Sequence, residues 1–199
     1  EEIINREELS EEGQENIQLA KKNTDRMLRL INQLLDFRKI QNNKMKLYIE
    51  QADVVTLSKK IYDNFTGLAH QRNIGFHFVC SYDNYTLYTD IDKLEKILFN
   101  LLSNAFKYTP DGKNIDLILE FKEKNLLIKV KDEGNGIELH KIDMLFKRFE
   151  TLGQTDANLS SGIGLSLVKE WDDMLHGTIT VDSKLRYGST FSISLPGGQ

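Results

Sequence analysis

Two asparagines, a lysine and a tyrosine lie close together in the segment NLLSNAFKYT. Asn100 and Asn104 are four residues apart, so a helix would place both amides on one face. Lys107 and Tyr108 follow about one turn later. Amide oxygens are hard, neutral ligands that suit Mg²⁺, and a lysine ammonium suits phosphate. Taken alone, the segment is better explained as a pair of solvated or capping asparagines near a helix end.

A second segment, DEGNGI, begins at Asp132, where an expected strand ends. Gly134 and Gly136 follow with one residue between them, which lets the backbone approach a ligand closely or adopt a positive φ. An ionised aspartate only accepts hydrogen bonds, so Asp132 can bind an exocyclic amine such as that of adenine. Taken as an isolated motif, the segment is better explained as an ordinary strand-to-helix turn.

A third segment, SSGIGLSLVKEW, places Gly162 and Gly164 just before an apolar helix. The free backbone N–H groups and the positive end of the helix dipole at such a point can hold phosphate. A glycine pair in this position also occurs where a helix merely packs closely.

In their order and spacing these segments resemble the nucleotide-binding domain of sensor histidine kinases, including hybrid sensor kinases. That domain belongs to the ATPase superfamily of gyrase, Hsp90 and MutL. The resembling motifs are the N box (NLLSNAFKYT), the first glycine box (DEGNGI), the phenylalanine box (LFKRFE), the second glycine box (SGIGLSLVK) and the closing strand motif (YGSTFSISLP). Upstream, RLINQLLDFRKIQNNKMKL resembles the second helix of the dimerisation and histidine-phosphotransfer hairpin. Five motifs in order make coincidence improbable, although each alone is a weak signal.

The resemblance implies that the ligands are ATP and Mg²⁺. It assigns Asn100 and Asn104 to Mg²⁺ and the phosphates, and Lys107 to the phosphates. It assigns Tyr108 to the edge of the nucleotide and Asp132 to the adenine amine.

The resemblance also implies roles for further residues. Gly134 and Gly136 would shape the adenine pocket, Gly162 and Gly164 the phosphate end of the lid, Phe146 and Phe149 would anchor the lid, and Thr190 would lie on the flanking strand. Ile137, Ile163 and Leu165 complete the set as apolar neighbours of the glycines.

Two positions depart from the family pattern. Glu133 stands where a small or amide residue is usual, and Ser160 where many members have a further lid glycine.

The superfamily supports two reactions, and the residue one turn before the metal asparagine distinguishes them. Hydrolytic members carry a glutamate there as general base, whereas this chain has Asn100, four residues before Asn104. The nearest carboxylate on the helix, Glu95, is nine residues before Asn104 and so lies on the opposite face. We therefore expect phosphoryl transfer to a histidine, and from there to the aspartate of a response-regulator receiver domain, rather than hydrolysis. The alternatives are an ATP-hydrolysing switch of the Hsp90, MutL or gyrase kind and a non-catalytic dimerisation module with a vestigial pocket.

The four histidines do not fit the role of phosphoacceptor. His70, His77, His140 and His176 all lie beyond the expected hairpin, and none has metal-ligand spacing to another. The resemblance places the acceptor on the first hairpin helix, so we expect a chain that begins inside the hairpin and does not phosphorylate itself.

The periodicity of apolar residues predicts an α+β fold. Residues 1–44 read as part of a helical hairpin, with a helix that starts at Ser10 and a homodimer formed through 10–42. The pattern of residues 45–199 predicts a two-layer α/β sandwich with a mixed, largely antiparallel sheet. The resemblance implies that this part is the ATP-binding domain, with a fold of the Bergerat type. Strands are expected at 45–49, 74–80, 84–88, 115–121, 126–132, 177–183 and 188–196, and helices after Asp53, after Asp90, at 139–149 and at 163–175.

Composition excludes several classes of protein. The 199 residues include 26 Lys and Arg, 30 Asp and Glu and one cysteine, Cys80. A slightly acidic chain without a basic tract is not expected to bind nucleic acid, and one cysteine forms no internal disulfide. No apolar run approaches the roughly 20 residues that cross a bilayer, so we expect no membrane contact by this chain. The resemblance implies a cytoplasmic domain of a membrane-anchored sensor kinase.

Overall fold

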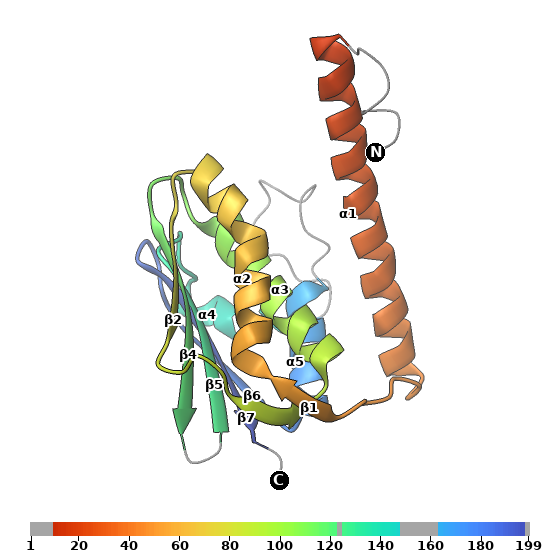
Figure 1. The fold of residues 1–199 in the computed structure, drawn as a ribbon, viewed down its shortest axis with the longest axis vertical. Helices are drawn as coiled ribbons and strands as arrows, with labels where there is room; N and C mark the ends of the chain where they lie inside the picture. Colours follow the sequence, from red (N-terminus) through yellow and green to blue (C-terminus); the bar gives the residue numbers. More distant parts are fainter. Residues whose placement is uncertain (1–9, 123–124, 148–162, 198–199) are drawn as a thin grey trace. The chain divides into compact units, whose positions relative to one another are not determined.

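The structure is a computed structural model that describes residues 10–122, 125–147 and 163–197. It divides into two compact units, Glu1–Met45 and Lys46–Gln199, which we describe separately (Figure 1).

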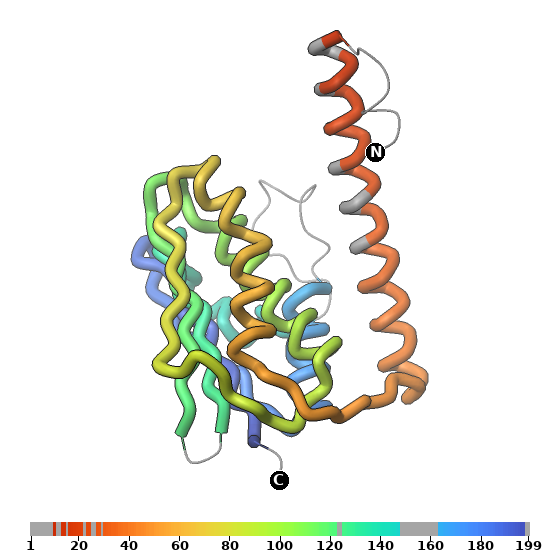
Figure 2. The backbone as a smooth tube through the Cα atoms, viewed as in Figure 1, coloured from red at the N-terminus to blue at the C-terminus, as the bar shows by residue number. Residues whose placement is uncertain are grey.

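The described part of the first unit is a single long helix, α1 (Glu11–Gln41), which Figure 2 shows as an uninterrupted coil. It begins where the sequence predicts, because the Ser10 hydroxyl accepts a hydrogen bond from the Gly13 N–H at 3.2 Å. Its apolar stripe is exposed: Met27, Ile31 and Leu34 are 64%, 47% and 48% accessible. The helix therefore presents an apolar face to solvent along its second half.

The second unit is a mixed sheet with helices on one face (Figure 1). The sheet has the strand order β2-β4-β5-β7-β6, in which β2 and β4 are parallel and the other neighbours antiparallel. A separate two-stranded sheet joins β1 to β3. The elements are β1 (Glu50–Asp53), α2 (Val54–Gln71), β2 (Gly75–Cys80), β3 (Thr86–Thr89), α3 (Ile91–Tyr108), β4 (Asn114–Lys122), β5 (Asn125–Asp132), α4 (Leu139–Ile142), α5 (Gly164–Met174), β6 (Thr178–Lys184) and β7 (Gly188–Pro196). The predicted two-layer, largely antiparallel architecture is confirmed.

Helix α3 is the centre of this unit. Asp90 caps it by accepting a hydrogen bond from the Lys93 N–H at 3.1 Å. Its apolar face is fully buried against the sheet and α5; that core includes Leu94, Ile97, Leu98, Leu101, Leu102, Ile115, Leu117, Ile128, Val130, Leu167 and Trp171. Because this face is fixed by packing, the orientation of the polar face of α3 is fixed as well.

Two predicted elements are wrong in extent. The strand expected at 45–49 is instead β1, Glu50–Asp53, because these four residues are the ones that pair with β3. Met45 and Leu47 are half-buried and Ile49 is exposed, and none of the three lies in a strand. The helix expected at 139–149 is described only as Leu139–Ile142, and residues 148 and 149 lie outside the described part.

Candidate nucleotide-binding site

The two asparagines lie on the half-buried face of α3. Asn100 donates a hydrogen bond from its amide nitrogen to the Lys96 carbonyl at 2.8 Å. Asn104 follows one turn later, and its side chain makes no hydrogen bond within the described part of the chain. An amide in this state can turn either its oxygen or its nitrogen toward a ligand.

The last turn of α3 carries Lys107 and Tyr108 beside a loop from the next motif. The Lys107 ammonium lies 4.9 Å from the centre of the Tyr108 ring, which is 47% exposed. The Tyr108 carbonyl accepts a hydrogen bond from the Asn135 N–H at 3.3 Å. The loop that follows β5 is therefore attached to the end of the asparagine-bearing helix.

The end of α3 is also held from α2, by an arginine that sequence reasoning did not single out. The Arg72 guanidinium donates hydrogen bonds to the carbonyls of Phe106 and Thr109, and its Nη2 lies 2.7 Å from Asp111 Oδ1. Carbonyls in the last turn of a helix have no intrahelical partner, so Arg72 satisfies groups that would otherwise depend on water.

We expect Arg72→Ala to lower the free energy of unfolding by about 2 kcal/mol, since charge-assisted hydrogen bonds to two carbonyls are lost. Arg72→Lys should lose most of the same free energy, because an ammonium cannot reproduce the fork of the guanidinium. Urea unfolding of the variants measures this.

The control for Arg72 is Asp111→Ala, which removes only the ion pair. The Asp111 side chain is 68% exposed, so this variant should lose no more than about 0.5 kcal/mol. An equal loss in Arg72→Ala and Asp111→Ala would mean that the ion pair, rather than the carbonyl contacts, holds the end of α3.

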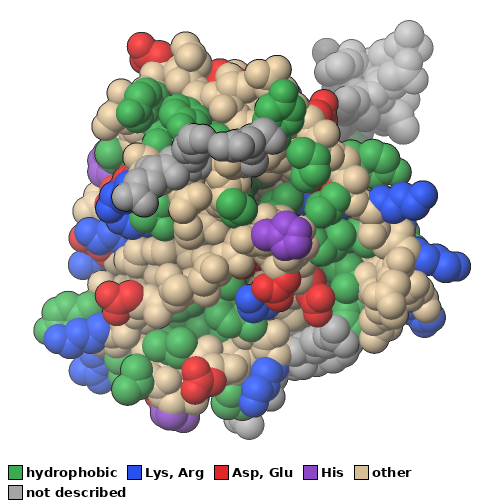
Figure 3. Space-filling model, turned by 90° about the horizontal axis from the view of Figure 1, so that it is seen from below, with side chains coloured by type: hydrophobic (Ala, Val, Ile, Leu, Met, Phe, Trp, Pro, Cys, Tyr) green, Lys and Arg blue, Asp and Glu red, His purple; other side chains and the backbone are tan. Residues whose placement is uncertain are grey.

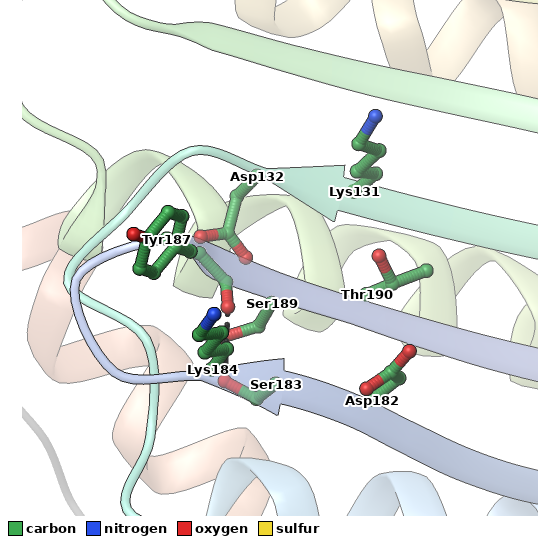
Figure 4. Close-up of a pocket in the computed structure, with 9 residues that line it drawn as sticks. Lys131, Asp132, Asp182, Ser183, Lys184, Tyr187, Ser189 and Thr190 are labelled. Atoms are coloured by element: carbon green, nitrogen blue, oxygen red, sulfur yellow. Dashed lines mark hydrogen bonds between the residues drawn. The ribbon is translucent and has the colours of Figure 1, made fainter.

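Asp132 is the buried carboxylate of the site. It is 6% exposed, and its Oδ1 accepts a hydrogen bond from the Gly134 N–H at 2.8 Å. Burial raises the pKa of Asp132, although the backbone N–H groups of Gly134 and Ser189 partly oppose this by donating to the carboxylate. Figure 4 shows the carboxylate pointing away from the Lys131 side chain, toward the β6–β7 hairpin.

Two glycines in the loop after β5 are required by close approaches. A Cβ at Gly134 would lie 2.7 Å from the Tyr108 carbonyl oxygen. Gly136 has a φ of +66°, and a Cβ there would overlap the carbonyl of Lys184 in β6. The loop is thus enclosed between the end of α3 and the β6–β7 hairpin, as a pocket-forming turn requires.

The closing strand places Ser189 and Thr190 on opposite faces of the sheet. Ser189 is the residue paired with Asp132 and is buried on the same, helix-facing side of the sheet. Thr190, which the resemblance implied, lies on the opposite face of β7, where it pairs with Lys131 and Asp182. The period of two along a strand explains the difference, because adjacent residues face opposite ways.

The β6–β7 hairpin also contributes Ser183, which sequence reasoning missed. Its hydroxyl lies 2.8 Å from the Ile137 nitrogen, 3.0 Å from the Gly188 carbonyl oxygen and 2.9 Å from the Ser189 hydroxyl. A shallow pocket of about 160 Å³ is lined by nine residues that include Ser183, Gly188, Ser189, Thr190, Asp132 and Asp182 (Figure 4). The alternation of GTITVDS, which puts Ser183 on the buried side with Ile179 and Val181, is the sequence signal that could have indicated it.

At the other end of the expected site, α5 begins at Gly164. Ile163 is buried at the N-cap position, Leu165 is half-buried, and the Ser166 hydroxyl donates to the Ile163 carbonyl at 2.8 Å. Phe146 is half-buried near α4. Gly162, Phe149 and the unusual Ser160 lie outside the described residues.

Glu133, which departs from the family pattern, is hydrogen-bonded to a neighbouring strand. Its carboxylate accepts hydrogen bonds from the backbone and side-chain nitrogens of Asn114, at 3.0 and 2.9 Å. Glu133 thus holds the start of β4. Glu95 is exposed on α3.

Over the described ranges, no three His, Cys, Asp or Glu side chains are grouped so that they could bind a metal. His77 pairs instead with Asp116, with 2.9 Å between Nδ1 and Oδ1. On the face in Figure 3, basic side chains are scattered among acidic ones. Within the same residues, none of the helices combines the length and apolar character that a bilayer crossing needs.

Comparisons with known proteins place this geometry in a family. Residues 89–199 match the family described as histidine kinase-, DNA gyrase B- and HSP90-like ATPases. Histidine kinase P4 of Formosa agariphila is 38% identical over 87% of this chain and 13% of its own length, and the sensor histidine kinase TmoS of Ectopseudomonas mendocina is 36% identical over 90% and 19%. The chain therefore spans less than a fifth of each of these relatives.

Solved structures share the fold. Full-length ShkA in complex with AMPPNP has a TM-score of 0.80 at 22% identity, covering 96% of this chain and 40% of that chain. The histidine kinase AdeS of Acinetobacter baumannii has a TM-score of 0.75 at 23% identity, covering 99% and 90%. Because the family match includes more than half of the residues, the chain belongs to the histidine kinase-, DNA gyrase B- and HSP90-like ATPase family.

Proposed function

We propose that this chain is the ATP-binding catalytic region of a sensor histidine kinase, which transfers the γ-phosphoryl group of Mg-ATP to a histidine. The observation that carries the proposal is the junction of α3 with the loop after β5. It brings a buried acceptor, Asp132, to the same loop that is bonded to the end of the helix bearing Asn104 and Lys107. In this proposal Asp132 accepts a hydrogen bond from the adenine amine on one side of that junction. Asn104 and Lys107 bind the metal ion and the phosphates on the other side.

The donor set fits Mg²⁺. The amide oxygens of Asn100 and Asn104 are hard neutral ligands, and such a site relies on the nucleotide's own phosphates for the remaining charge. When bound, the ion would neutralise charge on the phosphates, and Lys107 would add a point charge to them. The proposal assigns both asparagines to the ion.

Transfer is favoured over hydrolysis because the described residues offer no carboxylate beside Asn104. Asn100 occupies the position one turn earlier, Glu133 is bonded to Asn114, and Glu95 is exposed on α3. Phosphoryl transfer needs positioning and charge neutralisation more than a general base, so this arrangement suits a kinase. The Hsp90, MutL and gyrase type of switch is not favoured.

The partners follow from the same proposal. The exposed stripe of α1 would pair with a second copy in a homodimer, because an amphipathic helix is stable when its apolar face is covered. The phosphohistidine would pass its phosphoryl group to a receiver-domain aspartate. The region would work in the cytoplasm, where ATP is available, as part of a membrane-anchored sensor.

The test is to mix the chain with γ-labelled ATP, Mg²⁺ and a separate helical hairpin that carries the acceptor histidine of a histidine kinase relative. We expect label on the hairpin in an acid-labile form and none on a hairpin with that histidine replaced by glutamine. Steady release of phosphate from this chain alone would instead indicate the hydrolysing switch. Binding of ATP without either reaction would indicate a non-catalytic module.

A further inference from the structure

Ser183 joins three segments that meet beside Asp132. It lies near the end of β6, is half-buried and is paired with Ser189 of β7. Its hydroxyl is within hydrogen-bond distance of the Ile137 nitrogen, the Gly188 carbonyl oxygen and the Ser189 hydroxyl, at 2.8, 3.0 and 2.9 Å. The loop after β5 and the first two residues of β7 therefore share one side-chain oxygen of β6.

The capacity of a serine hydroxyl fixes the direction of these three bonds. A hydroxyl donates one hydrogen and accepts two. The Ile137 N–H can only donate and the Gly188 carbonyl can only accept, so Ser183 uses its hydrogen on Gly188 and one lone pair on Ile137. The bond with Ser189 must then use the second lone pair of Ser183, which makes Ser189 the donor.

This direction determines what Ser189 presents to its surroundings. Its only hydroxyl hydrogen is committed to Ser183, so toward any other partner Ser189 is an acceptor. Its backbone N–H donates to the Asp132 carboxylate, and both residues lie on the helix-facing side of the sheet. Two side chains that can only accept hydrogen bonds thus lie next to each other at this end of the pocket.

We propose that Ser183 is a positioning residue that sets base specificity by holding the Ser189 hydroxyl as an acceptor beside Asp132. The proposal rests on the proposed nucleotide-binding function. A purine with an amino group at position 6 offers hydrogens to both acceptors, whereas a 6-oxo purine would place an oxygen against them. Without Ser183 the Ser189 hydroxyl is released, can rotate and can donate to a 6-oxo group, so discrimination weakens.

The experiment compares ATP with inosine triphosphate, which carries an oxo group at position 6. Calorimetry on the full chain with Mg²⁺ gives the ratio of the two dissociation constants. We expect wild type to prefer ATP, and Ser183→Ala to reduce that preference by about fivefold or more, since one misplaced polar contact changes affinity by at least this factor. Ser183→Thr keeps the hydroxyl and should keep the preference.

A second pair of variants separates positioning from loss of stability. Ser189→Ala leaves the bonds of Ser183 to Ile137 and Gly188 in place and should reduce the preference as well. If Ser183 acts through Ser189, the double variant should show no further reduction, because coupled residues are not additive. Ser192→Ala makes the same change on the opposite face of β7 and should leave the preference unchanged.

Each outcome is decisive. An unchanged ratio in Ser183→Ala, with only a lower melting temperature, would overturn the inference, as would additive effects of the two serines. If Ser183→Ala fails to fold, an unchanged ratio in Ser189→Ala overturns it equally. Wild type that binds neither nucleotide would overturn the proposed function itself, whereas wild type that binds ATP with an unchanged ratio in both single variants overturns only the role of Ser183.

Discussion

Asp132→Asn is expected to weaken ATP binding by at least about 100-fold, because a charged acceptor is replaced by an amide in a buried site. The carboxylate already accepts from the N–H groups of Gly134 and Ser189, and its remaining lone pairs can accept from the adenine amine. Asparagine has a single acceptor oxygen for all of these donors, and its NH₂ group would oppose a donor. Calorimetry with ATP and Mg²⁺ measures the loss.

The same substitution should not weaken the fold. Burial raises the pKa of Asp132, so the ionised group costs free energy in the folded protein. The stability associated with its protonated form is present below the ordinary pKa of an aspartate and is lost as the pH rises through the raised value. At neutral pH Asp132→Asn removes this cost, so urea unfolding should show unchanged or higher stability.

The matched control is Asp182→Asn, an identical chemical change on the exposed face of β6 in the same pocket lining. It should leave ATP affinity within about twofold, as is usual for a surface substitution away from the bound group. Equal losses in the two variants, or an unchanged affinity in Asp132→Asn, would show that Asp132 does not bind the base.

A second large effect is expected at Asp172 in α5, which is fully buried. Neither of its carboxylate oxygens has a hydrogen-bond partner of good geometry among the described residues. The pKa of Asp172 is raised to about 6, mainly by burial and in part by the charge of Asp173, while Lys169 and the Ile179 N–H only partly offset these two causes. We expect Asp172→Asn to stabilise the protein by about 2 to 3 kcal/mol at pH 8, since each pKa unit corresponds to about 1.4 kcal/mol.

The sign of the pH dependence distinguishes this cause from others. A carboxyl with a raised pKa stabilises the folded state most when protonated, below its ordinary pKa of 3.8, and this stability is lost as the pH rises through about 6. The difference between Asp172→Asn and wild type should therefore shrink to about half by pH 5. Urea unfolding at both pH values measures this difference.

The control is Asp173→Asn, an exposed neighbour on the same helix, which should show a small difference from wild type at either pH. A difference for Asp172→Asn that does not change with pH would contradict the ionisation account.

The elements that the sequence predicted well are those with a local cause. Asp53 and Asp90 could be identified as caps because a helix start needs a side-chain acceptor, and both accept backbone hydrogen bonds. The apolar period of α3 was visible for the same reason. The strand at 45–49 was wrong because alternation does not reveal whether a partner strand is available.

The site residues also divide into those that a local pattern reveals and those that depend on distant segments. Asp132, Gly134 and Gly136 could be proposed from one short segment, and the structure shows why the backbone needs glycine there. The alternation along β6 could indicate that Ser183 lies on the buried side. Its contact with Ser189 beside Asp132 depends on how β7 pairs with β6 and with β5, which is a long-range property that no local pattern contains. Which of the neighbouring residues Ser189 and Thr190 lies on the same face of the sheet as Asp132 is a register question of this kind, decided by which face of the strand is buried.

The pairing of β5 with β7 has a consequence for the order of folding. The hairpins β4–β5 and β6–β7 each close between neighbouring segments, but Asp132 meets Ser189 only when one hairpin docks on the other. Contacts between distant segments form late, because they carry the largest loop-closure entropy. The surroundings of Asp132 therefore form only when the two hairpins pair late in folding. A chain in which both hairpins have formed separately still lacks the proposed base-binding site.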